Sequence, residues 1–405
     1  MLSHIYLSCF LAVAYARVHR LIVGNLVNAA FLYVLEFDGE STDLRIVSNT
    51  SAHDSHAWIA FGPTKETIYG ASLNSSTIAR YELTTDSHNS STLQPRLTGS
   101  AANCGGQTSA FVLAGQQPPF EVYSASWPGP RACGAAFPAS ARDGDLGGGP
   151  RYTWDYDASS GIHGLALGDN GTMLYSADLT GNSVWTHRIV GAAAIDGGGG
   201  GGGGIEVVGR LHARYGSGPR HLVAHPARRY LHVIMETSNE LVTYELDGET
   251  REPRREASAF SVIPEGLNRS SYLAAAVALS PSGRYLWAST RGQEASDVGY
   301  LSTFELDKDG AVVSAGRPGS GAGPGGKGPL FIVPMTTGGG ITNHVSPAPW
   351  SDEFVAMTDF GTGYVQIWKM TTTKKDGAMD GVGAAAVARV DIPDGGCCAN
   401  VIWYD

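Results

Sequence analysis

The stretch IHGLALGDNGTMLYSA, residues 162–177, decides the fold, because its strand–turn–strand pattern returns twice further along the chain. It returns as RHLVAHPARRYLHVI at residues 220–234 and as AAVALSPSGRYLWAS at residues 275–289. Short apolar and aromatic runs on either side of a turn rich in Pro, Gly, Asn or Asp are typical of β-hairpins. Each stretch therefore predicts a pair of antiparallel strands.

The three hairpins are regularly spaced along the chain. With Asp169, Pro226 and Pro281 taken as equivalent turn residues, the turns lie 57 and 55 residues apart. A period of this length indicates one small structural unit used many times rather than a set of independent domains.

The same pattern occurs on both sides of this region. Further hairpin-like segments lie at 21–37, 56–71, 109–137 and 343–370, and a recurring outer strand lies at 78–83, 241–246, 301–306 and 364–368. About seven such units, each unable to bury both faces alone, predict an all-β fold, a seven-bladed β-propeller of four-stranded antiparallel blades. The tail at 401–404 predicts a closing strand that completes a blade with the N-terminal segment.

We expect the propeller to form a single domain over residues 17–405. The glycine tract at 197–204 and the Gly/Pro-rich stretch at 316–328 lie between strands and predict flexible surface loops. Three tryptophans are expected to pack between blades: Trp58, Trp287 and Trp368.

Composition narrows the classes of function. The chain has 405 residues, 42% of them hydrophobic and 16% charged, so it can bury a large core. Its formal charge of -10 argues against a nucleic-acid-binding surface. Beyond the N-terminus, no apolar run approaches the ~20 residues of a membrane span, so no membrane partner is expected.

Residues 1–16 predict a signal peptide, because a mostly apolar core at 5–13 precedes a small-x-small cleavage pattern at 14–16. The alternative is an uncleaved first strand that is buried in the fold. Five Asn-x-Ser/Thr triplets suit a secreted glycoprotein: Asn49, Asn74, Asn89, Asn170 and Asn268. Together these features favour export through the secretory pathway.

Four cysteines remain after the signal peptide, an even number that is compatible with disulfides in an oxidising compartment. We expect Cys104 to pair with Cys133. The adjacent Cys397 and Cys398 either form a strained vicinal bridge or stay reduced. No Cys or His cluster has the spacing of a zinc site, so no metal is expected.

Four polar residues occupy matching points of the repeats. His163 and Arg220 each lie six residues before the turn residue of their unit. Glu236 and Arg291 each lie ten residues after it. The start of the first strand of a hairpin and the end of its second strand lie at the same end. We therefore expect all four side chains on one rim of the ring, near its centre, from three adjacent blades.

The chemistry of these four residues suits a small anionic substrate. Two arginines can bind carboxylates bidentately and keep their charge at any relevant pH. A histidine and a carboxylate beside them can act as general acid and base. The alternative for any one of them is a solvated or turn-capping role, which is common for polar residues at strand ends.

Three further histidines are weaker candidates for substrate binding on the same rim: His56, His221 and His344. A position between blades is the alternative for His221, as it is for His232. A hydrogen-bonding role in a loop is the alternative for His56.

Seven short motifs extend this pattern over nearly the whole chain. They are HAW (56–58), CGGQTSAF (104–111), IHG (162–164), PRH (219–221), ME (235–236), STRG (289–292) and WYD (403–405). In these motifs the chain resembles the fungal 3-carboxy-cis,cis-muconate cyclases, seven-bladed lactonizing enzymes related to the propeller-type 6-phosphogluconolactonases.

The resemblance implies a cofactor-free interconversion of 3-carboxy-cis,cis-muconate and its lactone. The catalytic set of the family would map onto His163, Arg220, Glu236 and Arg291. In that reading the two arginines hold the substrate carboxylates, while His163 or Glu236 exchanges a proton with carbon.

Two other functions stay open. Aromatic catabolism through carboxymuconate is expected inside the cell, whereas this chain carries an export pattern. A secreted lactonase that acts on a sugar lactone or another anionic lactone is therefore one alternative. A non-catalytic propeller that binds a protein or a glycan is the other.

Overall fold

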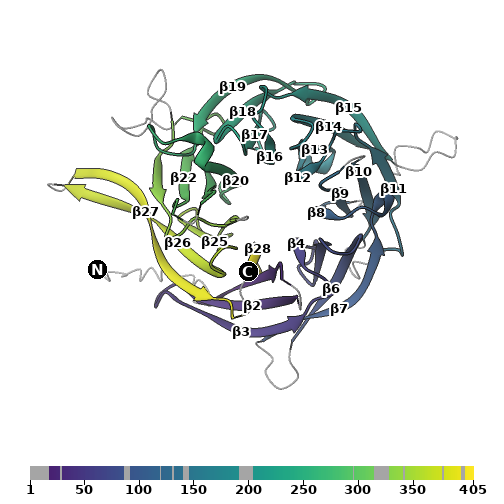
Figure 1. The fold of residues 1–405 in the computed structure, drawn as a ribbon, viewed down its shortest axis with the longest axis horizontal. Coiled ribbons are helices and arrows are strands. Elements are labelled where there is room, and N and C mark those ends of the chain that lie inside the picture. Colours follow the sequence, from purple (N-terminus) through teal and green to yellow (C-terminus); the bar gives the residue numbers. More distant parts are fainter. Residues whose placement is uncertain are drawn as a thin grey trace, which may run out of the picture.

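Seven four-stranded antiparallel sheets form a closed ring in the computed structural model (Figure 1). This confirms the predicted all-β, seven-bladed propeller. The structure describes residues 18–27, 30–85, 92–118, 120–129, 132–139, 146–190, 204–294, 296–313, 328–340, 343–375, 378–393 and 397–405.

Each blade has four strands that follow one another from the centre of the ring outwards (Figure 1). Blade 1 consists of β28 (Cys397–Trp403), β1 (Val18–Asn25), β2 (Phe31–Asp38) and β3 (Asp43–Ser51), and blade 2 of β4 (His56–Phe61), β5 (Thr67–Ser72), β6 (Thr77–Thr85) and β7 (Leu93–Ala102). Blade 3 consists of β8 (Ser109–Ala114), β9 (Glu121–Ser126), β10 (Cys133–Pro138) and β11 (Tyr152–Asp155). Blade 4 consists of β12 (Ile162–Gly168), β13 (Met173–Asp178), β14 (Ser183–Val190) and β15 (Gly204–His212).

Blade 5 consists of β16 (Pro219–Ala224), β17 (Tyr230–Met235), β18 (Glu240–Leu246) and β19 (Pro253–Ser261). Blade 6 consists of β20 (Tyr272–Leu279), β21 (Tyr285–Gly292), β22 (Tyr300–Glu305) and β23 (Phe331–Pro334). Blade 7 consists of β24 (Val345–Pro347), β25 (Phe354–Asp359), β26 (Tyr364–Lys375) and β27 (Ala378–Asp391). Short 3-10 helices lie at Cys104–Gly106, Asp169–Gly171 and Arg269–Ser271.

The C-terminal strand closes the ring, as the tail at 401–404 predicted. In blade 1, β28 pairs with β1, with Trp403 opposite Leu21 and Val401 opposite Val23. Asn400 in β28 joins blade 1 to blade 2, since its amide accepts from the Ile59 N–H and donates to the Ile59 carbonyl, both at 2.8 Å. Strands from the two ends of the chain thus complete one sheet.

The core of the molecule lies between neighbouring blades. Met173 and Tyr175 of blade 4, for example, pack with Leu231 and Val233 of blade 5. Because each blade is apolar on both faces, it is stable only between two neighbours. Two of the three tryptophans expected at such interfaces, Trp287 and Trp368, are buried together between blades 6 and 7.

The segments expected to be outer strands occupy the third position of their blades, so that expectation was wrong. A fourth strand lies outside each of them. The fourth strand of blade 5, β19, shows why the sequence hid it. Four consecutive residues of β19, from Arg254 to Ala257, are exposed, and the strand carries no apolar run that would mark it.

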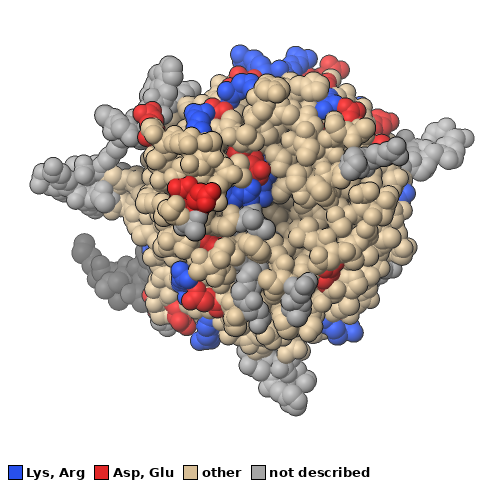
Figure 2. Space-filling view, viewed as in Figure 1, with Lys and Arg blue, Asp and Glu red and all other residues tan. Residues whose placement is uncertain are grey.

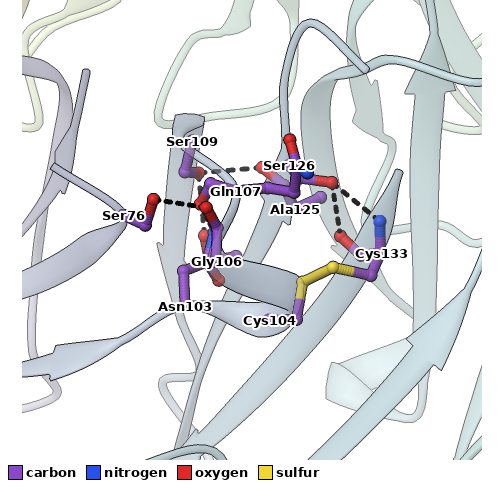
Figure 3. The surroundings of a disulfide bond; sticks show 10 residues. Ser76, Asn103, Cys104, Gly106, Gln107, Ser109, Ala125, Ser126 and Cys133 are labelled. Atoms are coloured by element: carbon purple, nitrogen blue, oxygen red, sulfur yellow. Dashed lines mark hydrogen bonds between the residues drawn. A yellow bond between two sulfur atoms is a disulfide. The ribbon is translucent and has the colours of Figure 1, made fainter. Parts of the chain in front are cut away.

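A disulfide joins Cys104 and Cys133, the pair expected from the sequence (Figure 3). Their Cα atoms are 6.0 Å apart, and the bridge ties the loop before β8 to β10 of the same blade. The Cys133 N–H also donates to the Ser126 hydroxyl at 2.7 Å. Cys397 and Cys398 belong to β28, but their side chains lie outside the described residues.

Several sequence predictions fall on parts of the chain that the structure does not describe. These are the proposed signal peptide at 1–16 and most of the two glycine-rich loops, at 197–203 and 316–327. Among the described residues, no helix is both long enough and apolar enough to cross a membrane.

Candidate active site

A β-bulge at the start of the inner strand recurs in five consecutive blades, 2 to 6. In each bulge one residue has no partner across the ladder, and a bulge re-aims the side chain of that residue. The bulged residues are Ala57, Ala110, His163, Arg220 and Ala275. The first four of them line one cavity near the centre of the ring.

This cavity, of about 240 Å³, receives side chains from all seven blades. Its polar lining consists of His163, Arg220, His221, Glu236, Arg291, Asn343 and His344. Its apolar lining consists of Leu26, Ala57, Trp58, Leu73, Ala110, Trp127 and Leu179. Figure 2 shows the hollow at the centre of one face, with basic and acidic side chains gathered at its edge. All four residues singled out by their position in the repeats lie in this cavity.

A single carboxylate oxygen joins the two arginines. Oε2 of Glu236 lies 2.7 Å from Nε of Arg220 and 2.9 Å from Nη2 of Arg291. Glu236 itself is held by its backbone, since its N–H donates to the Gly218 carbonyl at 2.7 Å and its carbonyl accepts from the Ala274 N–H at 3.0 Å. The two guanidinium groups are therefore fixed side by side from different blades.

Arg220 is further held by the bulge of the next blade. Its Nη1 donates to the carbonyl of Ala275, the bulged residue of β20. Burial, with a smaller effect of the nearby Arg291 charge, lowers the pKa of Arg220 to about 9. Burial also lowers the pKa of Arg291. With a pKa of about 9, Arg220 keeps its positive charge at neutral pH.

The histidines of the cavity are neutral at neutral pH. Nδ1 of His163 lies 3.2 Å from Nε2 of His221, so the two imidazoles share a hydrogen bond. Burial, followed by the positive charges of Arg220 and Arg291, holds the pKa of His163 well below 6.5. Burial also lowers the pKa of His344 to about 3. His221 also lines the cavity, where its ring contacts Trp58.

Trp58 and Trp127 add aromatic surface to the lining of the cavity, and sequence reasoning did not place either of them there. Trp58 stacks on Phe111 at 4.3 Å, and it therefore packs between blades as expected. It also lines the cavity, where His221 contacts its ring at 4.9 Å. Trp127 contacts His163 at 5.1 Å. Alignment of the bulges would have shown that Trp58 occupies the position of His221.

His56 does not line the cavity, so its proposed role in substrate binding is not supported by its position. The ring is 1% exposed, and its Nε2 lies 2.7 Å from the Tyr81 hydroxyl within blade 2. It packs against Gly70, where a Cβ would come within 2.6 Å of the imidazole. The reason is the bulge, which turns Ala57 rather than His56 towards the centre.

Asn343 is held rigidly at the edge of the cavity. Its side-chain amide donates to the Thr290 carbonyl at 2.8 Å, and its backbone carbonyl accepts from the Ser289 hydroxyl at 2.9 Å. Within the described ranges, no group of three or more His, Cys, Asp or Glu side chains converges in a way that would hold a metal ion. The ionisable side chains that line the cavity are two arginines, one glutamate and three histidines.

Comparison with known proteins identifies the family. The family model described as "Lactonase, 7-bladed beta-propeller" matches residues 20–322. The chain belongs to this lactonase family. Carboxy-cis,cis-muconate cyclase of Neurospora crassa is 31% identical over 401 residues, which cover 96% of this chain and 99% of that protein. The resemblance to the fungal cyclases is thereby confirmed.

One more distant relative and one solved structure extend the comparison. Muconate cycloisomerase 1 of Cutaneotrichosporon cutaneum is 26% identical over 218 residues, 53% of this chain and 52% of that protein. The periplasmic gluconolactonase of Pseudomonas aeruginosa has the same fold, with a TM-score of 0.68, 17% identity, and coverage of 95% of this chain and 99% of that one. The family model and the Neurospora crassa relative show that this lactonase-family chain is an enzyme of lactone conversion.

The shared carboxylate makes a prediction about the stability of this lactonase-family enzyme. Replacing Glu236→Gln removes the negative charge between two buried guanidinium groups, and we expect the free energy of unfolding to fall by about 3 kcal/mol. Urea denaturation measures the change. The control is Glu82→Gln, because Glu82 and its partner Arg96 are 43% and 64% exposed and such pairs contribute about 0–1 kcal/mol. Equal, small effects of both substitutions would contradict the prediction.

Proposed function

We propose that this enzyme interconverts 3-carboxy-cis,cis-muconate and 3-carboxymuconolactone without a cofactor. The observation that carries the proposal is the pair of buried arginines bridged by one carboxylate oxygen, with a neutral histidine in the same cavity. The likeness over 96% of the chain to the carboxy-cis,cis-muconate cyclase of Neurospora crassa supports it.

The charges of the cavity favour an anionic substrate. Two guanidinium groups face one carboxylate, and the histidines are neutral, so the lining carries a net positive charge. Arg220 and Arg291 bind substrate carboxylates through charge-assisted hydrogen bonds, which are stronger than neutral ones. Three carboxylates on one small molecule match this arrangement better than a neutral lactone does.

The other half of the cavity suits a flat, unsaturated carbon chain. Trp58 and Trp127 present aromatic surface against which a conjugated diene packs. The volume of about 240 Å³ is below the ~300–1,000 Å³ typical of pockets for drug-sized ligands. A small, planar, highly charged molecule fits both properties.

Ring closure needs orientation, charge stabilisation and one proton. A carboxylate oxygen adds to a carbon of the conjugated double bonds, a C–O bond forms, a π bond breaks, and the neighbouring carbon takes up a proton. The trianion thus becomes a dianionic lactone. Negative charge develops on the carboxylate conjugated with the double bond, where a fixed guanidinium stabilises it. Because the step is intramolecular, holding both ends in place supplies much of the acceleration.

His163 carries the proton in this proposal, and Glu236 positions the arginines. Oε2 of Glu236 already contacts Arg220 and Arg291, which makes that oxygen a poor base. His163 lines the cavity as a neutral imidazole, and its Nδ1 shares a hydrogen bond with His221. A neutral imidazole removes the proton during ring opening, and the imidazolium returns it during ring closure.

The substrate is tested by turnover of three compounds: 3-carboxy-cis,cis-muconate, its lactone and 6-phosphogluconolactone. We expect the first two compounds to interconvert with kcat/KM of at least about 10⁴ M⁻¹ s⁻¹. The absorbance of the diene measures this reaction. We expect Arg220→Lys to lower this value about 100-fold, because lysine lacks the planar fork. Arg229→Lys, at an exposed arginine outside the cavity, is the control and should change little. Turnover of the phosphorylated lactone alone would replace the proposal with a sugar lactonase.

The role of His163 is tested by pH dependence. Because its pKa lies well below 6.5, the imidazole is neutral between about pH 6 and pH 8, and its protonated fraction falls about tenfold per pH unit. We expect kcat/KM for ring opening to be flat over this range, and kcat/KM for ring closure to fall about tenfold per unit. His163→Ala should lower both about 10²–10⁴-fold, with partial rescue by added imidazole. Wild-type turnover by both His163→Ala and Glu236→Gln would show that neither residue transfers the proton.

We also propose that the chain is exported. The pattern at residues 1–16 supports this, and so does the disulfide between Cys104 and Cys133, since disulfides persist in oxidising compartments. Expression in a secreting fungal host should deliver the protein to the medium, with Arg17 as its first residue and a bridge between these cysteines. Mass spectrometry of the secreted peptides measures both. Retention in the cells with residues 1–16 attached would contradict the proposal.

A further inference from the structure

A second cavity, of about 610 Å³, is lined by the loops of blades 6 and 7 and shares Arg291 with the active-site cavity. The Arg291 side chain therefore belongs to the walls of both cavities. The proposed reaction uses only the inner cavity. The outer one is larger, and the conversion of carboxymuconate gives it no role.

The wall of the outer cavity is largely main chain. Gly339 and Gly340 have φ angles of 87° and 63°, a conformation that favours glycine. A Cβ on Gly340 would lie 2.3 Å from the nitrogen of Gly361, and one on Gly339 would lie 2.8 Å from the side-chain amide of Asn343. These close approaches require glycine, and Gly339, Gly340 and Gly361 all belong to the lining of the cavity.

These backbone groups offer hydrogen-bond donors. The N–H groups of Gly339, Gly340 and Gly361 make no hydrogen bond with any other described part of the chain. Gly339 is buried, and a buried main-chain donor that is left unpaired costs free energy, so an acceptor on a ligand would be bound favourably there.

The charges of the outer cavity exclude a second anion site. Glu294 and Asp359 both line it, and Arg291 is the one cation among its lining residues. Arg291 already pairs with Glu236 at 2.9 Å. A further carboxylate or phosphate would therefore meet two like charges. A neutral group that both accepts and donates hydrogen bonds meets no such repulsion, and hydroxyl groups have this property.

We propose that the outer cavity is an extension subsite that takes a neutral, hydroxyl-bearing substituent of a ligand whose carboxylate lies at Arg220 and Arg291. The glycine N–H groups donate to the hydroxyl oxygens, and a hydroxyl of the ligand donates to the exposed carboxylate of Glu294. The enzyme would then accept lactones, or the acids formed from them, that are longer than carboxymuconate. This inference rests on the proposed role of the two arginines in binding a carboxylate.

The experiment compares two ligands by isothermal titration calorimetry on the full-length protein. Gluconate carries one carboxylate and a short hydroxylated chain, and lactobionate is gluconate extended by a neutral galactosyl group. We expect lactobionate to bind at least about tenfold more tightly, which corresponds to one or two net hydrogen bonds. Because no turnover is required, a failure to convert carboxymuconate would leave this result unaffected.

Blocking variants test where the galactosyl group binds. Val298 lines the outer cavity and is 37% exposed, so Val298→Trp fills the space and should abolish the advantage of lactobionate over gluconate. Thr362→Trp, at a second exposed lining residue, should do the same. The matched control is Val313→Trp, also at a residue that is 37% exposed but outside the lining, and it should keep the advantage.

Two outcomes would overturn the proposal. In the first, lactobionate binds the wild-type enzyme no more tightly than gluconate, or neither ligand binds. In the second, Val298→Trp and Thr362→Trp both keep the full preference for lactobionate, which would place the galactosyl group elsewhere.

Discussion

Closure of the ring by the pairing of β28 with β1 is the constraint on which the rest of the structure depends. A propeller blade has two apolar faces and buries them only against neighbouring blades. The last strand must therefore return to the first sheet, and Asn400 then ties that sheet to blade 2. Because all seven blades contribute to the inner cavity, the site exists only when the ring is closed.

One backbone feature, a β-bulge at the start of the inner strand, recurs in the blades that build the site. A bulge near the start of the inner strand directs one side chain towards the centre in blades 2 to 6. His163 and Arg220 occupy two of these positions, and alanines at two others, Ala57 and Ala110, leave room for a ligand. The bulge of blade 6 contributes a carbonyl instead, which holds Arg220. The same bulge thus places ionisable side chains in the cavity in some blades and leaves room for a ligand in others.

The arrangement of charges explains how the side chains of this cavity can stabilise the negative charge that develops during lactone conversion. Two guanidinium groups, fixed by Glu236 and screened from water, face the cavity before any ligand enters. Their orientation therefore needs no rearrangement as charge develops on a carboxylate. The uncharged histidine beside them accepts or returns a proton without adding a third positive charge.

The sequence by itself determined the fold and the shared location of His163, Arg220, Glu236 and Arg291, because repeat spacing and hairpin direction are local properties of the chain. It also placed the closing strand and indicated the pairing of Cys104 with Cys133. It did not distinguish third from fourth strands, since exposed outer strands such as β19 lack an apolar run. Only the tertiary structure decided that Ala57, and not His56, faces the centre, and that Trp58 and Trp127 complete the cavity. The physical reason is that a one-residue bulge reverses the direction of a side chain, and its effect becomes visible only when the partner strand is in place.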